Sequence, residues 1–349
     1  MKESAVSRNC KMDNIKGLLI ICVVLGHLLE LNLSNNYNRI FYVIIYSFHM
    51  PTFIFISGYF AHFSIKKTMR KFLYPYILFQ MLYLVFQNIV LQHKMAYQIS
   101  TPYWILWYLF VLMAWNMLIP LLEKLQRWEY LVMAMTVVLS LGIGYLDSIG
   151  RTFSLSRMIV FFPFFVMGYY YRLNQSKGQY GSISKTIDRY RDENKYKRID
   201  KHWIMFSIVV LGVILSICIK NAGTINRNWL YEATAYAESS YSIYFRLFHI
   251  IMAVLWIGIL MILMPDRKLP IVTQAGMNTM SVYLLHGFII KSLADSKVII
   301  KLLEESMINT TGLETIVLLI ISVIIASLFS TQRVTTCLNV ILLKKQNKI

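Results

Sequence analysis

Long apolar runs recur along almost the whole chain, and they constrain its fold more than any other feature. An α-helix needs about 20 mostly apolar residues to cross a hydrocarbon core, and these runs have that length. The chain has 349 residues, of which 57% are hydrophobic, and its mean hydropathy is +0.54. A soluble domain of this size has no place to bury so much apolar surface. The sequence therefore predicts an all-α, polytopic transmembrane helical bundle.

We expect about ten spans in a single membrane domain that covers residues 1–349. Lys and Arg cluster in alternate connecting segments, which places both termini in the cytoplasm. The longest cationic segment is a basic loop at about 173–202, between the sixth and seventh spans, and we expect it to lie against anionic lipid. The net charge of +18 therefore indicates no nucleic-acid partner. The expected spans are 15–33, 38–60, 72–92, 103–122, 130–147, 157–172, 203–220, 243–264, 271–290 and 313–331.

The first span carries polar residues along one line, which we call the polar stripe: Lys16, His27 and Glu30. Eleven residues separate Lys16 from His27, so an ideal helix brings His27 to within about 20° of the Lys16 face and about 16 Å deeper. Glu30 follows three residues later on the same face. An imidazole and a carboxylate are costly to bury in a membrane helix, so a functional role is the default interpretation.

Three more histidines fall inside expected spans. His49 lies at mid-depth, in a second span that Pro51 is expected to kink. His249 lies near the outer end of the eighth span. His286 lies in the outer part of the ninth, where helix geometry sets it off the face that carries Asn278. We therefore expect His27 and His49 to form the deepest polar pair, with His286 further from the stripe.

Two arginines, Arg157 and Arg246, are expected near the outer face. They can simply snorkel to the interface, or they can bind an anionic group or sugar hydroxyls there. The four cysteines show no pairing or metal-ligand spacing, so we expect no disulfide framework and no metal.

This arrangement suits transfer of a group to a hydroxyl. A neutral imidazole beside a carboxylate is a general base, so His27 can deprotonate an alcohol while Glu30 orients the ring. Cations at the inner boundary suit a phosphorylated donor, and the candidates are Lys16, Arg70 and Lys71. The sequence has no Walker A motif and no glycine-rich dinucleotide turn, so ATP and NAD chemistry are not expected.

Six segments, taken together, resemble the integral-membrane acyltransferase-3 family, in particular its sugar O-acetylase branch. They occur in the order that the family shows and cover nearly the whole chain. They are MDNIKGLLIICVVLGH (12–27), FHMPTFIFISGY (48–59), KFLYPY (71–76), WILWYLFVLMAW (104–115), FFPFFVMGYYY (161–171) and GMNTMSVYLLHGF (276–288).

The resemblance implies transfer of an acyl group, usually acetyl from acetyl-CoA, to a hydroxyl of an extracytoplasmic or lipid-linked polysaccharide. It also implies a bacterial plasma membrane. The family's basic-x10-His motif corresponds to Lys16 and His27, and its arginine before the Phe-Pro-Phe segment corresponds to Arg157. The basic position is often arginine in the family, and lysine cannot make the same bidentate phosphate contact. His49, Arg157 and His286 are then expected to shape the acceptor side.

Two other functions remain open from the sequence. A glycan or small-metabolite transporter or flippase would use His27 and Glu30 as a proton relay, and the proline-broken second span fits this class. No internal repeat and no matched pair of broken helices supports it. A non-catalytic receptor or scaffold would have no evident use for the buried titratable stripe.

Overall fold

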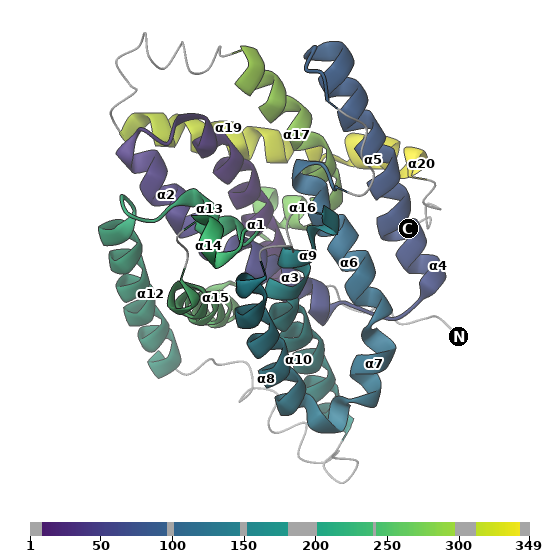
Figure 1. Ribbon diagram of the computed structural model, residues 1–349, viewed down its shortest axis with the longest axis vertical. Coiled ribbons are helices and arrows are strands. Elements are labelled where there is room, and N and C mark those ends of the chain that lie inside the picture. The colour runs from purple at the N-terminus through teal and green to yellow at the C-terminus, as the bar shows by residue number, and fades with distance from the viewer. Residues whose placement is uncertain are drawn as a thin grey trace. The chain divides into compact units, whose positions relative to one another are not determined.

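The computed structural model describes residues 9–95, 101–146, 152–180, 201–239, 242–296 and 312–342. Within these ranges every regular element is a helix, which confirms the all-α class (Figure 1). The chain divides into two compact units, which we describe separately. Unit 1 comprises Met1–Ile45 and Leu263–Ile349, and unit 2 comprises Tyr46–Ile262.

Seven helical segments of the described residues are long and apolar enough to cross a membrane, and each coincides with an expected span. Three expected spans have a different form. The span at 103–122 contains a shorter apolar helix over Trp104–Met117, and those at 157–172 and 271–290 are each built from two helices. The seven segments are Cys10–Asn32, Asn36–Tyr59, Ile65–Val90, Gln126–Tyr145, Lys201–Asn221, Ile243–Leu263 and Gly312–Phe329.

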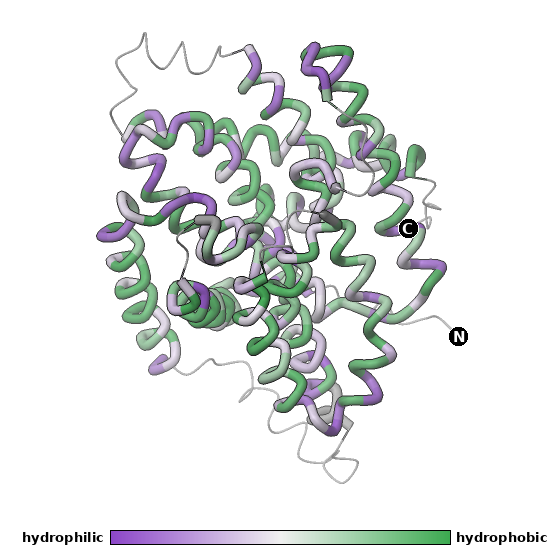
Figure 2. Tube along the Cα trace, viewed as in Figure 1, coloured by the Kyte–Doolittle hydropathy of each residue, from purple (hydrophilic) through white to green (hydrophobic). Residues whose placement is uncertain are grey.

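Hydropathy is high along several of these segments (Figure 2). The α12 helix (Lys201–Asn221) has a mean hydropathy of 2.4, yet only 17% of its apolar window is buried within the protein. An apolar helix that stays uncovered by protein is expected to face lipid. The basic loop expected to precede it falls largely on residues 181–200, outside the described residues, and the preceding α10 continues to Tyr180, beyond the expected end at 172.

Unit 1 is organised around its first helix, α1. The Asn9 side chain accepts a hydrogen bond from the Met12 amide at 3.1 Å and so caps the helix. Apolar side chains surround most of α1, and α16, α17 and α19 pack on it. The helices of this unit are α1 (Cys10–Leu29), the 3-10 turn η1 (Glu30–Asn32), α2 (Asn36–Tyr46, whose last residue belongs to unit 2), α16 (Pro270–Met277), α17 (Thr279–Ser296), α19 (Gly312–Phe329) and α20 (Gln332–Ile341).

Two glycines let α1 and α16 touch backbone to backbone. A Cβ added at Gly17 would lie 1.8 Å from the Val272 carbonyl oxygen, and one added at Gly276 would lie 1.7 Å from the Asp13 carbonyl oxygen. Only a residue without a side chain fits at such distances, and this is how small residues bring membrane helices together. The crossing fixes the inner half of α1 against α16.

A buried asparagine joins the same helices. Asn14 Nδ2 donates to the carbonyl oxygens of Pro265 and Arg267 at 2.9 and 2.8 Å, and its Oδ1 accepts from the Thr273 hydroxyl. Asn14 is fully buried, so each of its polar atoms must find a partner within the protein. The chain leading into α16 is thereby held to α1.

Unit 2 contains the remaining described helices. They are α3 (His49–Tyr59), α4 (Ile65–Thr68), the π-helix η2 (Met69–Leu73), α5 (Tyr74–Val85), the π-helix η3 (Phe86–Val90), α6 (Trp107–Met117), α7 (Ile119–Lys124), α8 (Glu129–Gly142), α9 (Leu155–Val160), α10 (Phe162–Tyr180), α12 (Lys201–Asn221), α13 (Arg227–Tyr231), α14 (Tyr236–Ser239) and α15 (Ile243–Leu263); the short 3-10 turns are η4 (Trp104–Leu106), η5 (Gln126–Trp128), η6 (Ile143–Tyr145) and η7 (Thr152–Ser154).

A second glycine crossing joins α3 to α10. A Cβ at Gly58 would lie 2.0 Å from the Phe165 carbonyl oxygen, and one at Gly168 would lie 1.9 Å from the Phe55 carbonyl oxygen. This confirms that Gly58 permits a close helix approach. Figure 1 shows the two helices side by side.

The second expected span is broken rather than kinked. One helix ends at Tyr46 and α3 begins at His49, so Pro51 is the third residue of a new helix. A proline in the first turn costs little, because the amide it lacks has no helical acceptor there. The interruption therefore falls before the proline, at Ser47 and Phe48.

Candidate functional site

The polar stripe of Lys16, His27 and Glu30 runs along α1 into η1, so we call it the α1 stripe from here on, and it begins with an ion pair. Lys16 Nζ lies 2.7 Å from Asp13 Oδ1, and the two side chains are 21% and 6% exposed. The carboxylate neutralises the lysine that we expected to meet a phosphorylated donor. The sequence analysis missed Asp13, although its i,i+3 spacing from Lys16 is the ordinary pattern of a helical ion pair.

His27 and Glu30 approach each other as predicted. His27 Nδ1 lies 3.6 Å from Glu30 Oε2, and both side chains are partly exposed, at 15% and 18%. This distance is too long for a hydrogen bond but close enough for the carboxylate to stabilise a protonated ring. Glu30 starts the 3-10 turn η1, and the Tyr42 hydroxyl donates to its other oxygen at 3.4 Å. Glu30 also interacts electrostatically with Lys291 of α17.

His286 lies much closer to the stripe than the sequence indicated. Its ring stacks on that of His27, with centroids 5.8 Å apart and an interplanar angle of 19°. The expectation that His286 is set off the stripe is therefore wrong. It considered only the phase of His286 on its own helix, which as α17 spans Thr279–Ser296, and not the helix packed against it. Contacts between α1 and α17 then decide the position of the ring.

A backbone contact defines the protonation pattern of His286. Its Nδ1 lies 2.8 Å from the Val282 carbonyl oxygen, and the side chain is fully buried. A carbonyl can only accept, so Nδ1 carries the proton and Nε2 carries the lone pair. His27, Glu30 and His286 thus bring two imidazoles and a carboxylate together in unit 1; we call these three residues the histidine cluster.

A second buried carboxylate, Glu314, lies next to the turn that carries Glu30. The amides of Asn32, Asn35 and Asn38 all donate to it, with Asn32 at 3.0 and 3.2 Å and Asn38 at 2.7 Å. The Thr315 hydroxyl in turn donates to Asn38 Oδ1 at 2.7 Å. The sequence analysis missed this cage, although the asparagine-rich stretch 32–38 and the lone acid that opens the last apolar run were visible. The cage holds the end of η1, and hence Glu30, to α19.

His49 and Arg157 lie in unit 2. His49 is 4% exposed, and its ring meets the edge of the Tyr46 ring at 4.7 Å. Arg157 does not snorkel: its Nε donates to the Tyr231 carbonyl oxygen at 3.0 Å, and its guanidinium lies 5.0 Å from the Trp107 ring centroid. The expectation that His49 and His27 form one polar pair stays a prediction.

Arg70 and Lys71 lie in the π-helix η2 of unit 2, and both are exposed. Lys71 Nζ lies 5.2 Å from the centroid of the Phe72 ring, a cation–π distance. Because both side chains are exposed, a donor could reach them without a rearrangement of the fold.

Arg246 and His249, which were expected near the outer end of the eighth span, are both buried within the protein. Arg246 is fully buried and pairs with Glu232, and His249 binds the other oxygen of the same carboxylate. Glu232 adopts a left-handed conformation, with φ 52° and ψ 32°, which costs a non-glycine residue about 1–2 kcal/mol. Nothing in the local sequence marks Glu232, because its partners lie 14 and 17 residues further on.

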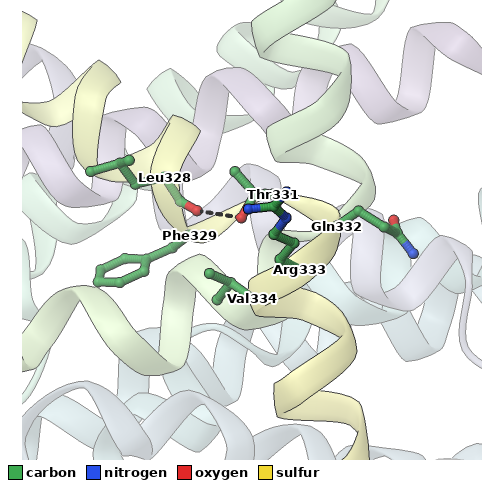
Figure 3. Close-up of a pocket in the computed structure, with 6 residues that line it drawn as sticks. All are labelled: Leu328, Phe329, Thr331, Gln332, Arg333 and Val334. Carbon is green, nitrogen blue, oxygen red and sulfur yellow. Dashed lines mark hydrogen bonds between the residues drawn. The ribbon is translucent and has the colours of Figure 1, made fainter.

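The described part of the chain holds no group of three or more His, Cys, Asp or Glu side chains placed to bind a metal ion. A hollow of about 600 Å³ lies at the turn between α19 and α20, where the Thr331 hydroxyl donates to the Leu328 carbonyl oxygen at 2.9 Å (Figure 3). None of the predicted site residues lines it. Its lining residues are Leu328, Phe329, Thr331, Gln332, Arg333 and Val334.

Comparison with known proteins agrees with the sequence motifs. No solved structure matches the chain. Nodulation protein NolL of Sinorhizobium fredii (strain NBRC 101917 / NGR234) is 47% identical over 68 residues, a stretch that spans 18% of this chain and 19% of NolL. The family model described as an acyltransferase domain (Acyl_transf_3) matches residues 11–331, which include the whole histidine cluster. The chain therefore belongs to the acyltransferase-3 family.

Proposed function

We propose that this protein is a membrane O-acyltransferase that moves an acyl group, in the first instance acetyl, from cytoplasmic acyl-CoA to a hydroxyl of an extracytoplasmic or lipid-linked polysaccharide. The observation that carries the proposal is the histidine cluster within a chain of this family. The similarity to a nodulation protein adds support only over the 68 matched residues. Ten spans, with both termini in the cytoplasm of a bacterial plasma membrane, complete the proposal.

His27 is the proposed general base. Its imidazole takes the proton of the acceptor hydroxyl, the oxygen attacks the thioester carbonyl, and the C–S bond breaks to release CoA. The proton on His27 then passes to the departing thiolate. Glu30, 3.6 Å away, stabilises the imidazolium formed in the first step.

His286 supports this chemistry as the stacked neighbour of His27. Its Nδ1 proton is held by the Val282 carbonyl, so Nε2 can accept a hydrogen bond from a hydroxyl in the cluster. His49 and Arg157 are proposed for the acceptor. Lys16, Arg70 and Lys71 are proposed for the donor phosphates, and Lys16 must then exchange its Asp13 partner for a phosphate.

Labelled acetyl-CoA tests the proposal directly. Membranes that contain the full chain are incubated with it and with glycan isolated from the producing cells, and label in the glycan is counted. His27→Ala should lower transfer about 100-fold or more, the usual contribution of a general base. His93→Ala, in an exposed part of unit 2, is the matched control and should retain wild-type transfer.

Wild-type rates for His27→Ala at equal protein levels would remove His27 from the mechanism. Proton-coupled glycan movement without any acyl transfer would favour the transporter class instead. Thermal stabilisation by CoA provides a separate measurement of donor binding, because it needs no acceptor.

A further inference from the structure

Unit 2 contains a second carboxylate–imidazole pair that the proposed mechanism does not use. Glu232 Oε1 accepts from His249 Nδ1 at 2.9 Å, and Glu232 Oε2 accepts from Arg246 Nε at 2.9 Å. The exposed fractions of Glu232, Arg246 and His249 are 1%, 0% and 6%. Arg246 Nη1 also donates to the Ser140 carbonyl oxygen, and its guanidinium lies 4.6 Å from the Tyr236 ring centroid.

These contacts determine which nitrogen of His249 is basic. A carboxylate paired with arginine is ionised and can only accept, so His249 Nδ1 carries the proton. In the neutral ring, Nε2 then carries the lone pair and is a hydrogen-bond acceptor. A carboxylate that fixes the ring and tautomer of a histidine in this way is common where the other nitrogen meets a ligand.

In unit 2, three buried polar atoms outside the Arg246–Glu232 pair have no hydrogen-bond partner among the residues that the structure describes. They are His249 Nε2, the Trp256 indole nitrogen and the Thr52 hydroxyl. The side chains of Thr52 and Trp256 are 2% and 6% exposed. Folded proteins rarely leave such atoms unsatisfied, so each points to a partner that the described residues do not supply.

The three atoms belong to one neighbourhood. His249 and Trp256 lie seven residues apart on α15, hence on one face and about 10 Å apart along the axis. The Phe48 ring stacks on Trp256 at 4.4 Å, and Thr52 follows one turn after Phe48 on α3. The Tyr46 ring, just before α3, meets the ring of Tyr231, the residue that precedes Glu232.

The chemistry of these atoms favours a neutral polyhydroxyl ligand. Nε2 accepts, the indole N–H donates and the threonine hydroxyl does either, whereas a sugar hydroxyl can both donate and accept. The charges of Arg246 and Glu232 neutralise each other, so this pair beside His249 offers no net charge to an anion. One water cannot bridge His249 and Trp256 across about 10 Å, but successive hydroxyls of a sugar can.

We propose that His249, oriented by Glu232, forms with Thr52 and Trp256 a binding site for the hydroxyl groups of a neutral glycan. The identification of this glycan as the acceptor rests on the proposed function. The three atoms are closed off in this structure, so the glycan must part α3 from α15 to enter.

Two substitutions separate ligand binding from support of the fold. His249→Asn places an amide where Nδ1 lies, which retains a donor for Glu232 but removes the Nε2 acceptor. Thr52→Val keeps the shape of the side chain and removes the hydroxyl. Thr52→Val should unfold at or above the wild-type temperature, because it loses no hydrogen bond seen in the structure. His249→Asn keeps the bond to Glu232 but removes buried ring atoms, so it should unfold somewhat below the wild-type temperature.

The measurement is thermal stabilisation of the purified full-length protein by the glycan isolated from the producing cells, without acyl donor. We expect His249→Asn to raise the half-maximal glycan concentration tenfold or more, and Thr52→Val to raise it severalfold. Stabilisation by CoA should stay within twofold of the wild type in both. Equal glycan stabilisation in wild type and both variants would mean that these atoms hold internal water, and would overturn the inference.

The two proposals fail separately. If acyl transfer is absent but His249→Asn weakens glycan binding, the site stands and the proposed reaction does not. If transfer occurs and His249→Asn changes neither glycan binding nor the acceptor KM, the reaction stands and this site is wrong. A lower unfolding temperature with equal losses for glycan and CoA would assign His249 a structural role only.

Discussion

Gly276→Ala should separate α1 from α16. The added Cβ would lie 1.7 Å from the Asp13 carbonyl oxygen, whereas real Cβ atoms essentially never approach another atom within 3.0 Å. The clash is with backbone, so no side-chain rotation relieves it and the helices must move apart by about 1.3 Å.

The expected cost follows from that movement. Overpacking a well-packed contact costs about 1–3 kcal/mol, and a clash between two backbones belongs at the upper end. The separation also stretches the hydrogen bonds from Asn14 to Pro265 and Arg267. In the wild-type structure these measure 2.9 and 2.8 Å, and each contributes about 1 kcal/mol. A loss of about 3 kcal/mol or more, over 100-fold in the folding equilibrium, is therefore expected.

Thermal unfolding of the purified protein in one detergent or nanodisc measures this loss. Gly258→Ala, in α15, is the matched control, because its Cβ would meet nothing within 4 Å and alanine is the better helix former. Gly17→Ala separates the same two helices. The loss of unfolding free energy in the double variant Gly17→Ala/Gly276→Ala should therefore be smaller than the sum of the two single losses. An unfolding temperature for Gly276→Ala that matches Gly258→Ala would refute the backbone contact.

Two further substitutions test the cage and the histidine cluster. Glu314→Gln should lower the unfolding free energy by about 3 kcal/mol, because its amide group would face asparagine donors. Glu129→Gln is the control: it loses one exposed bond to Asn174 and should change the unfolding free energy by less than about 0.5 kcal/mol. Equal unfolding temperatures for the two variants would contradict the cage. Glu30→Gln should reduce acyl transfer about 100-fold at an unchanged unfolding temperature, because an amide cannot stabilise the His27 imidazolium. Transfer is counted with labelled acetyl-CoA, and a wild-type rate in the Glu30→Gln variant would exclude that role for Glu30.

Helical spacing predicted the relative positions of side chains within one helix, but not between helices or at a helix break. Within α1, a regular helix, the i,i+3 spacing correctly predicted that His27 and Glu30 approach each other. The same geometry could not place His286 against His27, because that contact depends on how α17 packs on α1. Proline was likewise a correct sign of a break near residue 50, but the break lies at Ser47 and Phe48, four and three residues before Pro51.

The sequence by itself determined the membrane class, the helices, the family and the α1 stripe, because apolar runs, helical spacing and motifs are all properties of short stretches of chain. Only the tertiary structure decided which distant groups meet: His286 on His27, three asparagines around Glu314, and Glu232 between Arg246 and His249. Those contacts join residues 14 to 282 positions apart, so they depend on how separate helices pack against each other. A buried charge needs a partner, but its local sequence does not specify from which helix that partner comes.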